Sequence, residues 1–154
     1  MKKSPEAKIK ISVRAQQLVL KCGRKKLASY PVSTSRFGLG SKEGSFKTPT
    51  GKFRIAEKIG EGMAAGTVFK SRRPVKTTPK LLREEDLVMT RILWLDGLER
   101  RNANTHDRYV YIHGTNREDE IGTPAGHGCV RMKNADLLEL FERVKVGTPV
   151  EIAP

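Results

Sequence analysis

The feature that most constrains the fold is an alternation of apolar and polar residues in short segments of the N-terminal third. Residues 8–13 alternate strictly, residues 18–20 and 27–32 follow as apolar strand candidates, and residues 52–55 resume the alternation. Such a pattern is typical of strands that bury one face, because successive side chains point to opposite sides. Turn residues 23–26 separate two of the segments and predict a hairpin.

The second half of the chain adds further strands and one helix. Residues 89–95 and 109–113 are apolar segments of strand length, and residues 149–152 close the chain as a short strand. The helix is expected to begin with Asn134 as its N-cap and to end at Gly147. Its apolar face comprises Leu137, Leu138, Phe141 and Val144. The predicted fold class is therefore mainly β, with one helix in the C-terminal half.

Residues 8–154 are expected to form one domain after an N-terminal tail over residues 1–7. A chain of 154 residues is long enough to bury about two thirds of its unfolded surface without disulfides or metals. Residues 60–85 are the hardest to assign, because glycines and prolines interrupt any helical or strand periodicity of apolar residues there. A long excursion of this kind predicts a flap over a site.

The positive charge is concentrated in the N-terminal half. Residues 1–80 hold 20 Lys and Arg against 4 Asp and Glu, whereas residues 81–154 hold 10 against 13. A basic half suits nucleic acid, an anionic polymer or a carboxylate-rich substrate, or it is simply a soluble, lysine-rich surface. Few aromatic residues accompany the basic ones, which disfavours nucleic acid as the partner.

No segment of the sequence points to a membrane. The longest uncharged apolar stretches run only a few residues, against the roughly 20 that a membrane-spanning helix needs. Residues 4–8 stand where a secretory signal would require an apolar region. We therefore expect a cytoplasmic protein, or a periplasmic or extracellular one if an export signal lies outside this sequence. Its two cysteines are expected to be thiols.

The segment that carries chemistry is the glycine-rich stretch at residues 121–132, which contains His127 and Cys129. Glycines let the backbone turn sharply, expose a sulfur and aim N–H groups at one point. A thiol becomes a useful nucleophile when an imidazole takes its proton. His113, at the end of a predicted strand, is the candidate base, so the residues alone favour a catalytic Cys–His pair.

Two alternatives stay open at this point. Zinc could be bound by Cys129 with His127, His113 or His106, although the spacing is tight and no second cysteine lies nearby. Cys129 could otherwise be a buried thiol in a structural turn. Cys22, at a strand end, is expected to be structural, and His106 is expected to be a solvated loop residue.

Together these segments resemble the L,D-transpeptidase catalytic domain, also called the YkuD domain. That family carries a His-Gly pair, a spacer, and then Ser/Thr-His-Gly-Cys followed by an apolar residue and Arg or Asn. Here the pair is His113-Gly114, and the second motif covers residues 127–131. A Thr-Pro-Thr-Gly element at residues 48–51 matches as well, and the likeness runs over nearly the whole chain. Gly126 departs from it, because the family has Ser or Thr there.

The resemblance implies a curled β-sandwich of the YkuD type, with the cysteine in a cleft and a flap over that cleft. Cys129 would attack the L-centre carbonyl of the third residue of a peptidoglycan stem peptide, normally meso-diaminopimelate, and expel the terminal D-Ala. His113 would take the thiol proton, and the carbonyl of Gly114 would orient the imidazole. Neither a cofactor nor a metal enters this chemistry.

The remaining site residues follow from the same resemblance. The N–H groups of Gly128 and Cys129 would hold the oxyanion, and His127 would shape or polarise that pocket. Arg131 is the candidate for binding a substrate carboxylate, with an ion pair that holds the loop as its alternative role. Gly126 is also assigned to substrate binding, because its missing hydroxyl alters the loop or the choice of acceptor.

The acyl acceptor decides the physiological reaction. An amine gives a cross-link or an exchanged D-amino acid, whereas water gives an L,D-carboxypeptidase. Because cross-linking takes place outside the cytoplasmic membrane, we expect carboxypeptidase or D-amino acid exchange on tetrapeptides or muropeptides during recycling. The alternatives are a 3-3 cross-linking transpeptidase whose export signal lies elsewhere, and a non-catalytic module for an anionic wall polymer or nucleic acid. Carbapenem-type inhibitors are expected to acylate Cys129.

Overall fold

The computed structural model describes residues 6–84 and 86–154. The tail expected over residues 1–7 lies largely outside these residues, and the first strand begins at Ala7. The strands are β1 Ala7–Ser12, β2 Gln17–Cys22, β3 Lys25–Ser33, β4 Gly51–Ile59, β5 Val68–Lys70, β6 Arg73–Val75, β7 Val88–Gly97, β8 Tyr111–Gly114, β9 Val130–Met132 and β10 Pro149–Ala153. The helices are α1 Asn134–Arg143 and the short 3₁₀ turns η1 Leu81–Arg83, η2 Arg100–Asn102 and η3 Glu118–Glu120.

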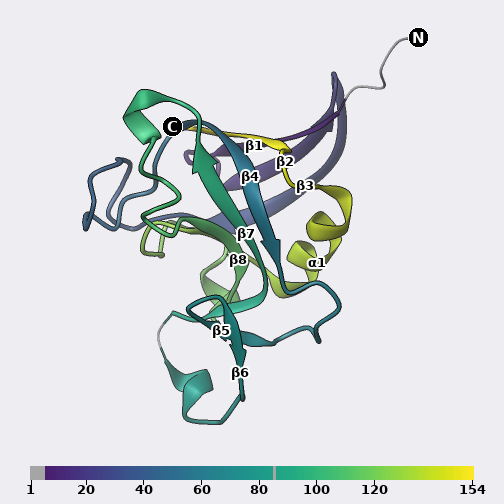
Figure 1. Cartoon of the computed structure of the whole chain (residues 1–154), viewed down its shortest axis with the longest axis vertical. Coiled ribbons are helices and arrows are strands. Elements are labelled where there is room, and N and C mark those ends of the chain that lie inside the picture. The colour runs from purple at the N-terminus through teal and green to yellow at the C-terminus, as the bar shows by residue number, and fades with distance from the viewer. Residues whose placement is uncertain (1–5, 85) are drawn as a thin grey trace.

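One ten-stranded sheet carries the fold and curls back on itself (Figure 1). Its strand order is β4-β10-β1-β2-β3-β9-β8-β7-β5-β6, and β4 also pairs with β7. Most neighbours are antiparallel, but β1 pairs in parallel with β10 and β8 with β9. The mainly β, curled architecture is therefore confirmed, as is the hairpin of β2 and β3.

The core lies between the curled sheet and helix α1, which packs against β7 and β8 (Figure 1). The helix buries Leu137, Leu140 and Phe141, so Leu140 takes the place that the sequence pattern gave to Leu138. Alternate strand residues supply the rest of the core, as expected for strands with one buried face. They include Ile9, Ile11, Leu18, Leu20, Val32, Phe53, Ile55, Leu93, Leu95, Ile112, Val130, Val150 and Ile152.

The start of helix α1 differs from the prediction. Asn134 is the first helical residue, and the N-cap is Lys133, whose side chain makes no capping bond. The Asn134 side chain is unavailable for capping because it is hydrogen-bonded to Thr90 and Thr115. Glu118 caps the helix from outside instead, since its Oε2 accepts the Asn134 N–H at 2.9 Å.

The end of the helix also comes earlier than predicted. The helix stops at Arg143, before Gly147. There the Lys58 ammonium donates hydrogen bonds to the carbonyls of Phe141 and Val144, both at 2.7 Å. These carbonyls belong to the last turn and have no partner within the helix, so β4 supplies the C-terminal cap.

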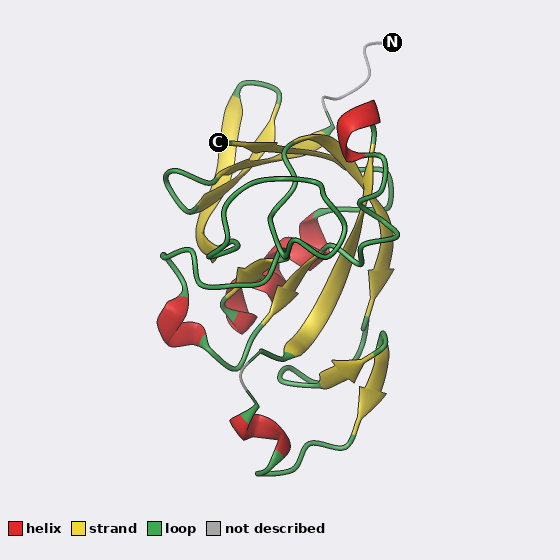
Figure 2. Ribbon diagram, turned by 90° about the vertical axis from the view of Figure 1, so that its left-hand side faces the viewer, coloured by secondary structure: helices red, strands yellow, loops and turns green. Residues whose placement is uncertain are grey.

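Residues 60–84 contain regular structure as well as loops. Strands β5 and β6 form a hairpin, and β5 pairs with β7 through Val68 and Met89. Figure 2 shows this hairpin projecting below the main sheet. Residue 85, the last of the predicted excursion, lies outside the described residues. None of the helices in residues 6–84 and 86–154 has the length and apolar character that a bilayer crossing requires.

Replacing Lys58 tests the cap that β4 gives to α1. Lys58→Met keeps the methylene packing but removes both charge-assisted hydrogen bonds, so we expect the free energy of unfolding to fall by about 1–2 kcal/mol. Urea denaturation measures this change. Lys10→Met, on the exposed face of β1, is the control with the same substitution. An equal loss in both variants would contradict the capping role.

Candidate active site

The two sequence motifs meet because β8 and β9 are parallel neighbours. His113 lies opposite Arg131 in this pairing. Cys129 immediately precedes β9, and its sulfur accepts the backbone N–H of Tyr111, on β8, at 3.3 Å. Because side chains alternate along strands, Cys129 and His113 lie on the same face of the sheet. The predicted nucleophile, which precedes β9, thus lies on the same face of the sheet as the predicted base on the adjacent strand β8.

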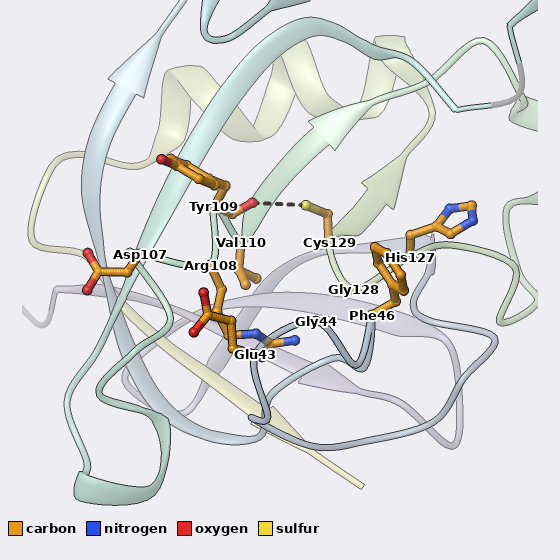
Figure 3. Close-up of a pocket in the computed structure, with 10 residues that line it drawn as sticks. All are labelled: Glu43, Gly44, Phe46, Asp107, Arg108, Tyr109, Val110, His127, Gly128 and Cys129. Carbon is orange, nitrogen blue, oxygen red and sulfur yellow. Dashed lines mark hydrogen bonds between the residues drawn. The ribbon is translucent and has the colours of Figure 1, made fainter.

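Cys129 is half-buried and lines a cavity of about 400 Å³. The cavity lies between residues 43–46, 107–110 and 127–129 (Figure 3). Besides accepting the Tyr111 N–H, the sulfur donates to the carbonyl oxygen of Tyr109 at 3.4 Å. The thiol is therefore anchored by backbone groups at the wall of an open cavity.

The His113 imidazole is buried and held in one orientation. The residue is only 2% exposed, and its Nδ1 lies 2.5 Å from the carbonyl oxygen of Gly114. A carbonyl only accepts, so Nδ1 carries the proton and Nε2 keeps a lone pair for use as a base. Within the part of the chain that the structure describes, no hydrogen bond joins this imidazole to the Cys129 sulfur. Transfer of the thiol proton to this imidazole would require the thiol to turn away from the Tyr109 carbonyl.

Burial favours the neutral form of both candidate groups. It raises the pKa of the Cys129 thiol to about 12, while the Tyr111 N–H acts in the opposite sense. Burial also lowers the pKa of His113 below its usual range, although the negative charge of Asp86 opposes this effect. Burial disfavours the charged form of an ionisable group, because the surrounding protein solvates charge less well than water does. Both shifts favour a thiol and a neutral imidazole in the resting site.

The backbone at Gly128 has a conformation that favours glycine. Its φ is +121°, and a Cβ added there would lie 3.3 Å from the carbonyl oxygen of Lys47. Thr48 Oγ1 donates to the Gly128 carbonyl at 3.0 Å, which fixes this peptide beside Cys129. The oxyanion role of the Gly128 and Cys129 N–H groups remains a prediction.

His127 is fixed by its surroundings. Its Nδ1 lies 3.0 Å from a carboxylate oxygen of Asp86, and its Nε2 lies 2.6 Å from the Arg36 guanidinium. A guanidinium only donates, so Nε2 accepts and Nδ1 carries the proton. The rings of Phe37 and Phe46 both stand 5.9 Å from the imidazole. This arrangement suits a residue that shapes the cavity wall, and Figure 3 shows its ring directed away from Cys129.

Arg131 is buried and bonded within the protein. Its guanidinium pairs with Glu120 at 3.0 Å and with Asp86 at 3.5 Å, and it donates to Ser33 at 3.0 Å. These contacts correspond to its alternative role, an ion pair that holds the loop. Among the described residues its Nε has no partner, and a Cβ on Gly126 would lie 3.1 Å from that atom. The hydroxyl that Gly126 lacks would therefore stand beside an unpaired donor.

Sequence reasoning missed Asp86, the residue that connects two of the predicted site residues. Its carboxylate contacts both His127 and Arg131, and its charge acts on Cys129 and His113. Asp86 lies at the end of the region without clear periodicity, some 40 residues from its partners in the chain. Only its position just before a buried strand distinguished it, and that signal is too general to identify a role.

A buried polar network behind the His113-Gly114 pair was also missed. Thr90 has a φ of +75°, which is a strained conformation for a β-branched residue. Its Oγ1 donates to the Asn134 side-chain oxygen at 2.6 Å, and the Asn134 amide donates to the Thr115 carbonyl at 2.8 Å. A Cβ on Gly114 would collide with Asn134. Asn134 therefore packs directly on the backbone that orients the imidazole.

The three histidines have separate partners. His106 stacks on Trp94 with ring centroids 3.9 Å apart, and its Nε2 lies 3.2 Å from Glu57. His127 contacts Asp86, and His113 contacts the Gly114 carbonyl. Among residues 6–84 and 86–154, no group of three or more His, Cys, Asp or Glu side chains is arranged to hold a metal ion.

Comparison with known proteins identifies the family. The family model of the L,D-transpeptidase catalytic domain, YkuD, matches residues 6–152. The chain belongs to this family. A related sequence, YqjB of Bacillus subtilis, is named as an L,D-transpeptidase. It is 46% identical over 48 residues, which are 31% of this chain and 27% of YqjB.

Solved L,D-transpeptidase structures share the fold. The L,D-transpeptidase from Mycobacterium smegmatis superposes with a TM-score of 0.64 at 17% identity and covers 97% of this chain. The L,D-transpeptidase LdtMt1 in complex with imipenem superposes with a TM-score of 0.62 at 19% identity, also over 97% of this chain. In both cases this chain spans 59% of the solved chain. It thus covers only part of the length of its relatives.

The neutral resting pair predicts how alkylation of Cys129 depends on pH. In a Cys22→Ser background, the iodoacetamide rate should rise about tenfold per pH unit between pH 6 and 9, because the thiolate fraction does so below the thiol pKa. Mass spectrometry follows the adduct. The urea-unfolded protein is the control, and its rate should level off near the ordinary thiol pKa of about 8.5. A plateau near neutral pH in the folded protein would show a thiolate–imidazolium pair instead.

Removing the Asn134 side chain tests the network behind His113. Asn134→Ala should lower the first-order rate of carbapenem acylation at Cys129 by about ten- to a hundredfold, since small displacements of a catalytic group are costly. The carbapenem concentration that gives half of the maximal acylation rate should change little. Asn102→Ala, which removes partly buried hydrogen bonds to the carbonyls of Thr50 and Lys52, is the control for stability. The same rate loss in both variants would indicate a purely structural role.

Proposed function

We propose that this chain catalyses cysteine-dependent acyl transfer at the L,D peptide bond of peptidoglycan stem peptides. The observation that carries the proposal is the position of Cys129 at the wall of a 400 Å³ cavity, with the buried His113 on the adjacent strand. Membership of the L,D-transpeptidase family supports this chemistry.

In the proposed reaction, the Cys129 thiol gives its proton to Nε2 of His113, and the sulfur attacks the L-centre carbonyl of the third stem residue. A C–S bond forms, and the N–H groups of Gly128 and Cys129 stabilise the oxyanion. The C–N bond to D-Ala then breaks, and the amine leaves with the proton held by His113. The Gly114 carbonyl stabilises the protonated imidazole because it accepts the Nδ1–H bond.

The acceptor that we propose is water or a free D-amino acid, acting on a thioester made from a tetrapeptide or muropeptide. Hydrolysis yields a tripeptide, and exchange replaces the terminal D-Ala. A cytoplasmic location and a role in muropeptide recycling remain predictions from the sequence.

We also propose that carbapenems acylate Cys129. Imipenem is bound to the solved LdtMt1, and a cavity of about 400 Å³ lies beside Cys129 in this chain. A β-lactam ring offers the same carbonyl electrophile as the peptide substrate, so the same thiol and imidazole would serve both reactions.

Incubation with a disaccharide-tetrapeptide, followed by mass spectrometry of the products, tests the proposal. We expect loss of D-Ala in buffer and an exchanged tetrapeptide when a D-amino acid is added. Cys129→Ser should abolish turnover and the carbapenem adduct, whereas Cys22→Ser should retain both. Cross-linked dimers as the sole product would overturn the proposed acceptor. Absence of both turnover and adduct in the unmodified protein would favour a non-catalytic binding module.

A further inference from the structure

A second cavity lies close to the nucleophile and contains an arginine in an unusual backbone conformation. Arg72 follows Ser71 in the turn between β5 and β6, and their φ values are +65° and +48°. Turns with two positive φ values usually contain Asn or Gly, because other residues pay about 1–2 kcal/mol for this conformation. Tyr109, across the cavity, also has a positive φ of +57°. Strain retained at such positions points to function.

The cavity has a volume of about 380 Å³ and aromatic walls. Its lining residues are Arg72, Trp94, His106, Asp107 and Tyr109. The Arg72 guanidinium lies 4.9 Å from the ring centroids of both Trp94 and Tyr109, and it donates one hydrogen bond to the Tyr111 hydroxyl at 3.2 Å. A guanidinium has five N–H donors. The aromatic contacts therefore hold Arg72 in place while it retains donors for a ligand.

This cavity adjoins the reacting sulfur. Asp107 and Tyr109 line both the second cavity and the one that contains Cys129. The Tyr109 carbonyl accepts a hydrogen bond from the Cys129 thiol. Cys129 also packs against the hydrophobic cluster that contains Trp94. A ligand in the second cavity would thus lie next to a thioester formed on Cys129.

We propose that the second cavity binds the acyl acceptor, and that this acceptor is an α-amino acid recognised through its carboxylate by Arg72. A planar guanidinium matches a carboxylate with two parallel hydrogen bonds. Asp107 supplies the opposite charge in the same cavity and complements the ammonium group of the same ligand. The exposed ring of Tyr109 is the part of the wall that can contact the side chain of the ligand. The inference rests on the acyl transfer proposed above and assigns the acceptor for it.

Arg72 acts in this step as a binding residue. With the carboxylate held, the ammonium group first releases one proton to solvent, and the resulting neutral amine nitrogen attacks the thioester carbonyl carbon. A C–N bond forms and the C–S bond breaks. The electron pair of the C–S bond goes to sulfur, and the proton lost by nitrogen returns through His113 to the thiolate. Asp107 disfavours a multiply charged anion such as phosphate, because like charges in one cavity repel.

The partition of the thioester between exchange and hydrolysis tests this proposal. Both products arise from one intermediate, so their ratio does not depend on how fast the thioester forms. With disaccharide-tetrapeptide and a fixed, subsaturating concentration of D-methionine, we expect Arg72→Gln to lower the exchange-to-hydrolysis ratio at least tenfold. Arg73→Gln, the same change at the adjacent exposed position, should leave the ratio within twofold of the parent value.

A ligand without the carboxylate provides the complementary test. The parent protein should use D-methioninamide at least tenfold less well than D-methionine, whereas Arg72→Gln should not distinguish the two. Equal use of both amines by the parent, or an unchanged partition ratio in Arg72→Gln, would overturn the proposal.

Binding can be measured without turnover, because Trp94 is the only tryptophan of the chain and lines the cavity. In Cys129→Ser, D-methionine should change the tryptophan fluorescence in a saturable manner, and Arg72→Gln in that background should weaken binding at least tenfold. Saturable binding that Arg72→Gln leaves unaltered, or absence of binding, would contradict the acceptor site. Failure of the proposed function would instead appear as a lack of thioester and carbapenem adduct on Cys129.

Discussion

The parallel pairing of β8 and β9 is the contact on which the site depends. It places Cys129 beside Tyr111 and brings His113 onto the same face of the sheet, although the two candidate residues lie in separate segments of the chain. The surrounding structure reinforces this pairing. Arg131, opposite His113, is tied to Glu120 and Asp86, and Asn134 packs behind Gly114. Paired strands thus fix the positions of the Cys129 and His113 side chains. Loops without such pairing would hold these side chains less firmly.

Burial has two opposing consequences for a cysteine nucleophile. It raises the pKa of Cys129 and lowers that of His113, so the resting thiol is protected from ionisation. The same burial leaves the imidazole in its basic form, with the lone pair on Nε2 because Nδ1 bonds to Gly114. In the proposed reaction, the charged pair forms only when proton transfer is coupled to attack, and the oxyanion donors would compensate for the charge. Substrate, rather than the resting environment, would therefore activate the sulfur.

Sequence patterns predicted most strands because half-buried strands alternate over short distances. The Cys129 and His113 motifs directed attention to two segments that the structure brings together. Contacts between distant segments were beyond such patterns. The sequence around Asp86 gives no local signal of its bond to His127. Asn134 is a residue type that favours the N-cap position, but its side chain is hydrogen-bonded to Thr90 and Thr115. Arg131 matches a substrate-binding residue in sequence, but its burial and two carboxylate partners are visible only in three dimensions.

The most direct test of the account is the protonation state of His113 in the resting protein. The ¹⁵N chemical shifts of its two ring nitrogens, measured by NMR at pH 7 in a His106→Gln and His127→Gln background and checked against His113→Gln, report that state. We predict a protonated Nδ1 and an unprotonated Nε2. Protonation of both nitrogens would reveal an imidazolium paired with a resting thiolate, and a proton on Nε2 alone would leave no base facing the sulfur. Either result would contradict the mechanism.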